Sequence, residues 1–246
     1  MLYQYAVSPF CEKVRRLLHA KGVPFRVEEV SLARSVRLVP KLSPIRRLPV
    51  LDLDGRRLWD STEIAYALEE LYPEPPLIPA DPAERARCHV LEDWADESLY
   101  FYEMTMRFLW PANVGRWVAA TVHADPRWSR SLAPVLVPRA LRKRAVPQGV
   151  GRKPRELVLR ELDRHLDALA AMLAGGEWLV GERLSLADIA VASQLTAIAG
   201  AKEGEEALGR RPEVRAWVAR VDRTTGIERG GATATPEGEA ALPSAR

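Results

Sequence analysis

A proline-rich stretch, PEPPLIPADP at residues 73–82, divides this chain of 246 residues into two parts with different patterns. Proline cannot continue a helix and favours extended backbone, so the stretch predicts a linker. Strand and helix signals alternate before it, whereas only helical patterns follow it. We therefore predict an α/β domain over residues 1–75, a linker over 76–82 and an all-α domain over 83–226.

The part before the linker predicts the element order β-α-β-α-β-β-α. An apolar run, LYQYAV, is typical of a strand, and a helical pattern follows from Ser8 to Lys21, where Gly22 ends it. Alternation in FRVEEV predicts the next strand, and a segment with a less clear pattern runs on to Pro44. Asp-Gly between LPVLDL and RRLW favours a β-hairpin, and apolar spacing predicts a final helix over residues 61–71.

The part after the linker predicts helices and no strands. Apolar residues at helical spacing cover four segments, 83–108, 156–173, 185–199 and 212–221. Prolines between Pro111 and Pro154 predict shorter, broken pieces there. Residues 227–246 lack periodicity and bulky apolar side chains, which predicts a disordered tail.

Composition argues against several classes of protein. No apolar stretch approaches the roughly 18 residues of a transmembrane helix, and the N-terminus lacks the pattern of a signal peptide. The two cysteines, Cys11 and Cys88, lie far apart in sequence and form no disulfide framework, which fits a reducing compartment. The four histidines have no metal-ligand spacing. We expect a cytoplasmic protein with no metal and no membrane partner.

Charge is distributed unevenly, because residues 127–155 contain nine Lys or Arg and no Asp or Glu. Such runs occur in proteins that bind nucleic acids or other anions. No aromatic residues interleave with the basic cluster RALRKR to stack on bases. We therefore interpret the segment as a solvated helix surface and expect no nucleic-acid partner.

Ser8 and Cys11 lie at the start of the first predicted helix. Serine is favoured as an N-cap and Pro9 at the first helical position, which puts Ser8 at the positive end of the helix dipole. The hydroxyl and the dipole together would stabilise a thiolate ligand, although capping alone also explains this serine.

Cys11 shares an apolar helix face with Val14 and Leu17, which favours packing. Its place near the helix N-terminus could instead lower the pKa of its thiol.

Two further motifs suit the binding of a small peptide. In RRLPVL, the backbone of Leu48 before Pro49 would stay open to pair with an extended ligand, and Arg47 could hold a carboxylate. Asp60 and Ser61 come directly before a helical pattern, where the hydroxyl and amides suit a ligand carboxylate and Asp60 suits an ammonium group. A strand start and a helix cap are the simpler explanations of the same residues.

These motifs, in this order and followed by a linker and a helical domain, resemble the cytosolic glutathione transferases over roughly residues 2–224. GERLSLADIAVASQL, in which Ser185 and Asp188 predict a capping box, resembles a buried helix of that family's second domain. The resemblance implies a thioredoxin-like first domain that binds glutathione, and SPF is similar to tau-type members in which the serine activates the thiol. It also implies a homodimer and a small-molecule electrophile as the second substrate.

The resemblance assigns roles to individual residues. Ser8 is expected to activate the glutathione thiol, and the peptide is expected to bind at Arg47, Leu48, Pro49, Asp60 and Ser61. The electrophile pocket is expected between Ser8 and a long helix bearing Trp94, Phe101 and Tyr102. One alternative is a glutathione thiol transferase or peroxidase that depends on Cys11. Another is a non-enzymatic binding module that uses the same fold as a scaffold.

Overall fold

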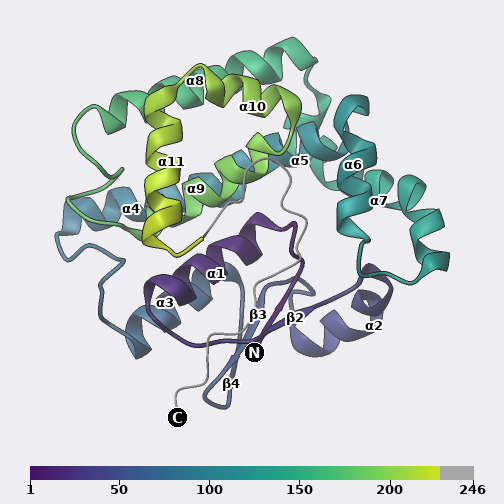
Figure 1. Ribbon diagram of the computed structural model, residues 1–246, viewed down its shortest axis with the longest axis horizontal. Coiled ribbons are helices and arrows are strands. Elements are labelled where there is room, and N and C mark those ends of the chain that lie inside the picture. The colour runs from purple at the N-terminus through teal and green to yellow at the C-terminus, as the bar shows by residue number, and fades with distance from the viewer. Residues whose placement is uncertain (228–246) are drawn as a thin grey trace.

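The computed structural model in Figure 1 describes residues 1–227. Nearly all of the tail predicted over residues 227–246 therefore lies outside the described residues. The described chain begins with a four-stranded sheet flanked by helices and continues as helices alone. This arrangement confirms the predicted α/β, thioredoxin-like first part and the all-α second part.

The sheet has the strand order β2-β1-β3-β4. Strand β1 (Leu2–Gln4) pairs in parallel with β2 (Val27–Glu29) and antiparallel with β3 (Val50–Leu53). Strand β4 (Arg56–Trp59) continues from β3 through the Asp-Gly turn, whose two residues both have positive φ. The predicted hairpin is thus present, and the start of β3 lies beside β1 near the segment that leads into the first helix.

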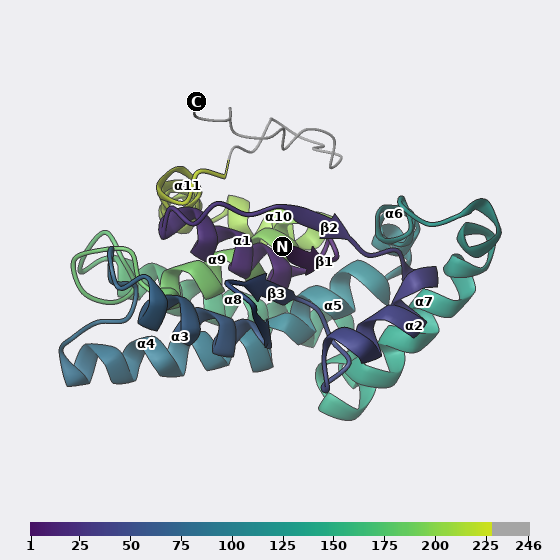
Figure 2. The ribbon, with the colours of Figure 1, turned by 90° about the horizontal axis from the view of Figure 1, so that it is seen from below.

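Three helices complete the predicted order: α1 (Pro9–Ala20), α2 (Leu32–Leu42) and α3 (Ser61–Leu71). Helix α2 occupies the segment whose sequence signal was least clear. Two of its N-terminal amides donate to the carboxylate of Asp125 in the second part of the chain, each at 2.8 Å. Figure 2 shows α2 beside the helices of that second part, so α2 forms one wall of the space between the two parts.

Helix α1 lies between the sheet and the helical part of the chain (Figure 1). It packs against α3 and against α9 (Leu186–Ala199). The buried guanidinium of Arg16 lies 2.7 Å from Glu12 and 2.5 Å from Asp222 of α11 (Pro212–Thr224). Because α1 also begins at Ser8, the packing of the helical part fixes the position of that serine.

Residues 82–224 form a succession of helices. The long helix predicted over 83–108 is present, with a π-helical turn, η1, in its middle, and the helices predicted over 156–173, 185–199 and 212–221 are present within a few residues. The elements in addition to α9 and α11 are α4 (Pro82–Trp94), η1 (Ala95–Leu99), α5 (Tyr100–Phe108), α6 (Pro111–Thr121), α7 (Arg127–Gln148), η2 (Val150–Arg152), α8 (Arg155–Leu173) and α10 (Lys202–Gly209).

Helix α7 departs from the prediction of short, proline-broken pieces. It continues for 22 residues through Pro134, Pro138 and Pro147. Each internal proline removes a backbone hydrogen bond, yet Ala133 and Val137 on the inner face of α7 pack into a core with residues of α5 and α6. Tertiary packing has therefore overridden the local preference.

Helix α10 was not predicted, and its glycines explain why. A Cβ atom at Gly204 would lie 2.0 Å from the carbonyl oxygen of Ile198 at the end of α9. Glycine is thus required for the close approach of α10 to α9, although it weakens the helical pattern of the sequence.

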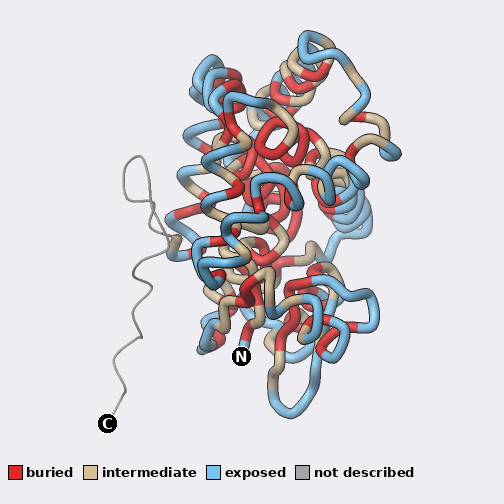
Figure 3. The backbone as a smooth tube through the Cα atoms, turned by 90° about the vertical axis from the view of Figure 1, so that its right-hand side faces the viewer, coloured by how far each residue is buried: buried red, intermediate tan, exposed pale blue. Residues whose placement is uncertain are grey.

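Helix α9 forms the centre of the main core, and Figure 3 shows buried residues concentrated inside the helical part. The predicted capping box is confirmed, since the Ser185 hydroxyl accepts from the Asp188 amide while the Asp188 carboxylate accepts from the Ser185 amide. That carboxylate also accepts a hydrogen bond of 2.9 Å from the Trp217 indole. Within the part of the chain that the structure describes, no helix is long and apolar enough to cross a membrane.

Candidate active site

A cavity of about 500 Å³ lies between the two parts of the chain. One side is formed by residues 7–10 at the start of α1, by α2, and by residues 46–48 before β3. The other side is formed by α5 and α7. Ser8 and Leu48, two residues from separate sequence motifs, therefore line the same space.

Ser8 is the N-cap of α1, as predicted. Its backbone is extended, and its hydroxyl accepts a hydrogen bond of 3.4 Å from the amide of Cys11. A hydroxyl that accepts through its oxygen still carries a proton that it can donate. Ser8 thus lines the cavity at the positive end of the α1 dipole, where a donated hydrogen bond would favour an anion.

Cys11 is buried in a small core with Val39, Leu48 and Val50, and no part of its side chain is exposed. Burial raises the pKa of its thiol to about 11, and hydrogen bonds from the Tyr5 backbone and from Ser8 only partly oppose this rise. The thiol does not line the cavity. The possibility of a lowered pKa at Cys11 is therefore wrong, and the packing interpretation fits the structure.

Leu48 and Arg47 both line the cavity, and the peptide bond between Leu48 and Pro49 is cis. Arg47 is exposed, whereas Leu48 is buried. Among the described residues, no backbone hydrogen bond joins Leu48 to another segment, so its amide and carbonyl can pair with a ligand. This geometry agrees with the open backbone that the sequence predicted before the proline.

Asp60 and Ser61 begin α3, with Asp60 as its N-cap. One oxygen of the Asp60 carboxylate accepts from the amides of Thr62 and Glu63, at 2.9 and 3.3 Å. The Ser61 hydroxyl lies 3.5 Å from a carboxylate oxygen of Asp96 and is buried. Neither residue lies among those lining the 500 Å³ cavity. A ligand that reached both this pair and Ser8 would therefore extend beyond that cavity.

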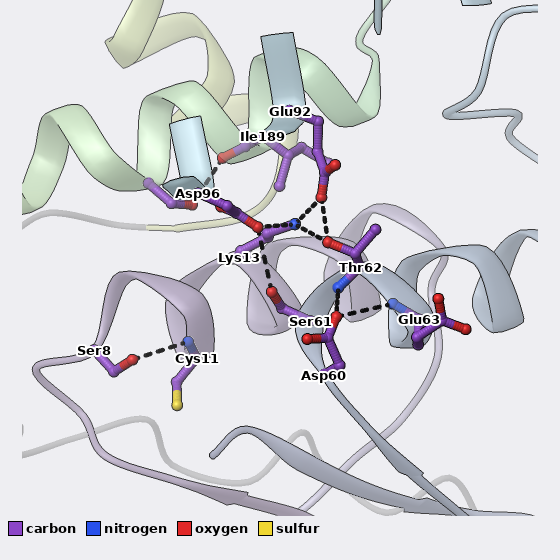
Figure 4. A network of polar contacts seen from close by, with 11 residues as sticks. Ser8, Cys11, Lys13, Asp60, Ser61, Thr62, Glu63, Glu92, Asp96 and Ile189 are labelled. Atoms are coloured by element: carbon purple, nitrogen blue, oxygen red, sulfur yellow. Dashed lines mark hydrogen bonds and ion pairs between the residues drawn. The ribbon is translucent and has the colours of Figure 1, made fainter. Parts of the chain in front are cut away.

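A buried charge network, which no sequence motif indicated, lies beside Ser61 (Figure 4). The ammonium group of Lys13 forms ion pairs with Glu92 and, at 2.7 Å, with Asp96. The Thr62 hydroxyl donates to the same Glu92 oxygen at 2.6 Å. The spacing of four between the two acids was visible in the sequence, but nothing in the pattern of α1 predicted that an interior lysine would meet them.

The network contains two carboxylates and one ammonium group. Burial raises the pKa of Asp96 to about 6, despite the opposing effect of Lys13. Burial alone would lower the pKa of Lys13, but the nearby Asp96 and Glu92 raise it. Lys13 is thus held in its charged form, and the raised pKa of Asp96 lets its carboxylate take a proton more readily than an exposed aspartate does.

The aromatic residues expected to line the electrophile pocket, Trp94, Phe101 and Tyr102, do not line this cavity. The Tyr102 hydroxyl donates to Glu161 at 2.8 Å, and both Tyr102 and Trp94 pack against the His165 ring of α8. Phe101 packs between the two apolar cores. The aromatic side chains that do line the cavity are Tyr5, Phe10, Tyr100 and Phe108.

This difference has a physical reason. Of the four cavity-lining residues of α5, Tyr100, Glu103 and Arg107 recur at spacings of three and four, which is one face of an α-helix, and Phe108 ends the helix. Tyr102 lies on another face of the helix, and Phe101 packs against the two apolar cores. Aromatic content identified the helix, but it does not indicate which face meets the cavity, and η1 changes the helical phase just before α5.

Profiles of two domains match this chain. The glutathione S-transferase N-terminal domain matches residues 2–76, and the glutathione S-transferase C-terminal domain matches residues 131–220. FtsZ-localized protein A of Caulobacter vibrioides is 30% identical over 201 residues, which cover 80% of this chain and 76% of that protein. The chain belongs to the cytosolic glutathione S-transferase superfamily.

Plant relatives match a shorter part of the chain. Glutathione S-transferase DHAR3, chloroplastic, from Arabidopsis thaliana is 42% identical over 78 residues, which are 32% of this chain and 30% of that protein. Glutathione S-transferase U6 from the same plant is 33% identical over 93 residues, 37% of this chain and 42% of that protein. The matches thus span less than half the length of these relatives.

Solved structures match over nearly the whole chain. A glutathione S-transferase from Rhodospirillum rubrum has a TM-score of 0.64 and 22% identity, covering 96% of each chain. The structure of FzlA from C. crescentus has a TM-score of 0.61 and 26% identity, covering 96% of this chain and 95% of that one. The first of these likenesses is one of fold alone.

Proposed function

We propose that this protein is a glutathione transferase in which Ser8 activates the thiol of glutathione. The observation that carries the proposal is the Ser8 hydroxyl in the wall of the cavity, at the N-terminus of α1. A hydrogen bond from this hydroxyl, together with the helix dipole, would lower the pKa of a bound thiol and increase the fraction of thiolate. The thiolate is the nucleophile, and membership of the superfamily supports glutathione as its source.

Glutathione would lie along the start of β3. The open backbone of Leu48 would pair with the cysteinyl segment, and Arg47 would bind the glycyl carboxylate. The γ-glutamyl end would reach Asp60 and Ser61 at the N-terminus of α3. The thiolate sulfur would then bond to the electrophilic carbon of a second substrate, while the leaving group departs with its electron pair and the thiol proton passes to solvent.

The alternative chemistry at Cys11 has less support. A mixed disulfide with glutathione needs an accessible thiolate. The Cys11 side chain is fully buried and the pKa of its thiol is raised to about 11. Ser8 is therefore the better candidate for contact with the glutathione sulfur.

A non-enzymatic binding module is the second candidate, and one specific observation favours it. FtsZ-localized protein A covers 80% of this chain, a larger share than the two plant transferases cover. The name of that protein describes a location at another protein rather than a reaction. In that case the cavity would be retained as a scaffold feature, and glutathione would not bind.

Calorimetric titration of the reduced protein with glutathione separates the two candidates. Binding with one site per chain supports the transferase, and a Ser8→Ala variant that binds glutathione but conjugates slowly would support the role of the hydroxyl. Absence of binding to folded protein would reject the transferase and favour the binding module. We also propose a cytoplasmic location and a homodimer, and light scattering of the purified protein tests the homodimer directly.

A further inference from the structure

The cavity beside Ser8 has a positively charged lining. Among the described residues that line it, four are arginines, Arg46, Arg47, Arg107 and Arg144, and the carboxylate is that of Glu103. Uncompensated positive charge in a partly enclosed site concentrates anions. The ligand that the cavity favours therefore depends on which arginines already have an acidic partner.

Arg107 already has such a partner. Its guanidinium lies 2.7 Å from the carboxylate of Glu103 and donates to the carbonyl of Val7 at 2.9 Å, and both charged side chains are 2% exposed. Its Cζ atom also lies 3.7 Å from the centre of the Trp117 ring. Arg107 is thus held in place with its charge offset, and Glu103 is not available to neutralise the other arginines.

Arg144 and Arg47, which belong to different elements, both affect the pKa of the Tyr100 hydroxyl. Burial and the charge of Glu103 raise the pKa of Tyr100 to about 12, while Arg144 of α7 and Arg47 of the loop before β3 oppose this rise. Tyr100, Arg47 and Arg144 all line the cavity. Two cations and one hydroxyl therefore converge on one region of the cavity.

The rest of the lining is largely apolar. Cavity volumes of about 300–1,000 Å³ are typical of sites for small organic ligands, and this cavity falls within that range. An aryl or alkyl group would contact side chains from α1, α2, α5 and α7, namely Phe10, Val36, Val39, Phe108 and Leu141. The cavity thus combines an apolar surface with a cationic corner.

We propose that the second substrate is an electrophile with an apolar body and a carboxylate or similar anionic group, which Arg144 and the Tyr100 hydroxyl bind. This inference rests on the proposed function, in which Arg47 is taken by the glycyl carboxylate of glutathione. Arg46 and Arg144 then remain, and Arg144 is the one that comes from α7, across the cavity from Ser8 and Leu48. A charge-assisted hydrogen bond in a partly enclosed site favours the anionic ligand over its neutral counterpart.

The test compares two glutathione conjugates by calorimetric titration, S-benzylglutathione and S-(4-carboxybenzyl)glutathione. They differ by one carboxylate on the group that would occupy the apolar side of the cavity. We expect the carboxylated conjugate to bind about tenfold more tightly, which is typical of one hydrogen bond to a charged group. Arg144→Gln should reduce this ratio to near one. Arg142→Gln is the matched control, because Arg142 is an exposed arginine of α7 that does not line the cavity.

Each other outcome has a distinct meaning. Equal binding of the two conjugates to the unaltered protein would overturn the anionic substrate and leave the proposed transferase intact. A preference that survives Arg144→Gln, or that is lost equally in Arg142→Gln, would overturn the role of Arg144. Failure of both conjugates to bind to folded protein would reject the proposed function, and the inference with it.

Discussion

The Ser61 hydroxyl at the start of α3 lies 3.5 Å from Asp96, and that carboxylate is itself 2.7 Å from the ammonium group of Lys13. A candidate glutathione-binding residue is therefore joined to a buried charge network that spans both parts of the chain. The network contains more negative than positive groups, so its protonation should affect stability.

The stability of the protein should reveal the titration of Asp96. Burial raises the pKa of this carboxyl to about 6, so the folded protein binds more protons than the unfolded chain between about pH 4 and pH 6. The contribution of Asp96 is thus present at low pH and is lost as the pH rises to about 6. Relative to an Asp96→Asn variant, the unaltered protein should lose stability over that range, as measured by urea unfolding at a series of pH values. Asp93→Asn, an exposed neighbour on α4, is the control, and a trend of opposite sign would contradict the assignment.

Lys13→Met should destabilise the protein strongly. It leaves the carboxylates of Glu92 and Asp96 buried without their cation, and breaking a buried ion pair in this way costs about 3–5 kcal/mol. Adding Glu92→Gln and Asp96→Asn to Lys13→Met should restore much of the lost free energy of unfolding, since no buried charge then remains in the network. Equal stability of the single and triple variants would show that the network does not behave as coupled charges.

Ser8→Ala should lower the rate of conjugation much more than the affinity for glutathione. Loss of a hydrogen-bond donor to the reacting sulfur is expected to reduce kcat about 100-fold. Loss of the N-cap should also reduce the free energy of unfolding by about 1 kcal/mol, which denaturation measures separately. Ser8→Thr retains a hydroxyl and serves as the matched control. Unchanged turnover in Ser8→Ala would remove Ser8 from the mechanism.

Cys11 should not react while the protein is folded. With the pKa of its thiol near 11, only about one molecule in 10⁴ would carry the thiolate at pH 7. Intact-mass analysis after incubation with oxidised glutathione should find no adduct on the folded protein, whereas in urea both Cys11 and Cys88 should be modified. A glutathione adduct that forms on Cys11 in the folded state would restore the alternative chemistry.

Replacing each of two helical glycines by alanine should change the stability of the protein in opposite directions. At Gly204 the added Cβ would lie 2.0 Å from the Ile198 carbonyl oxygen, so Gly204→Ala should destabilise the protein by about 1–3 kcal/mol. At Gly115 of α6 no other atom lies within 4 Å of the added Cβ, so Gly115→Ala should stabilise it by up to about 1 kcal/mol. Thermal unfolding of both variants checks the pair, and the close contact of α9 with α10 would be refuted by a neutral Gly204→Ala.

The parts of the fold that the sequence predicted are those with local causes. The Ser8-Pro9 start of α1, the Asp-Gly turn and the Ser185 capping box each depend on neighbouring residues, and all three are present. Proline content likewise marked the change from the sheet to the helices. These signals needed no knowledge of which segments meet in space.

The parts that the sequence did not predict depend on contacts between distant segments. Continuity of α7 through its prolines follows from packing against α5 and α6. The pairing of Lys13 with Glu92 joins residues that are 79 positions apart. In the candidate site, Ser8 and Leu48 were indicated by local motifs and do line one cavity, whereas the choice of Tyr100 over Phe101 and Tyr102 depends on the orientation of α5.

The ion pairs of α1 also determine how the protein can be recombined. Lys13 and Arg16 belong to the first part of the chain, but their partners Glu92, Asp96 and Asp222 all belong to the second. A chimera that joined residues 1–75 to the helical part of another superfamily member would leave the buried Lys13 without an anion and Arg16 with Glu12 alone, unless it also supplied those three acids. The first part of the chain can therefore be exchanged only together with the acids of the second part that pair with it. For design, the two parts are a single unit.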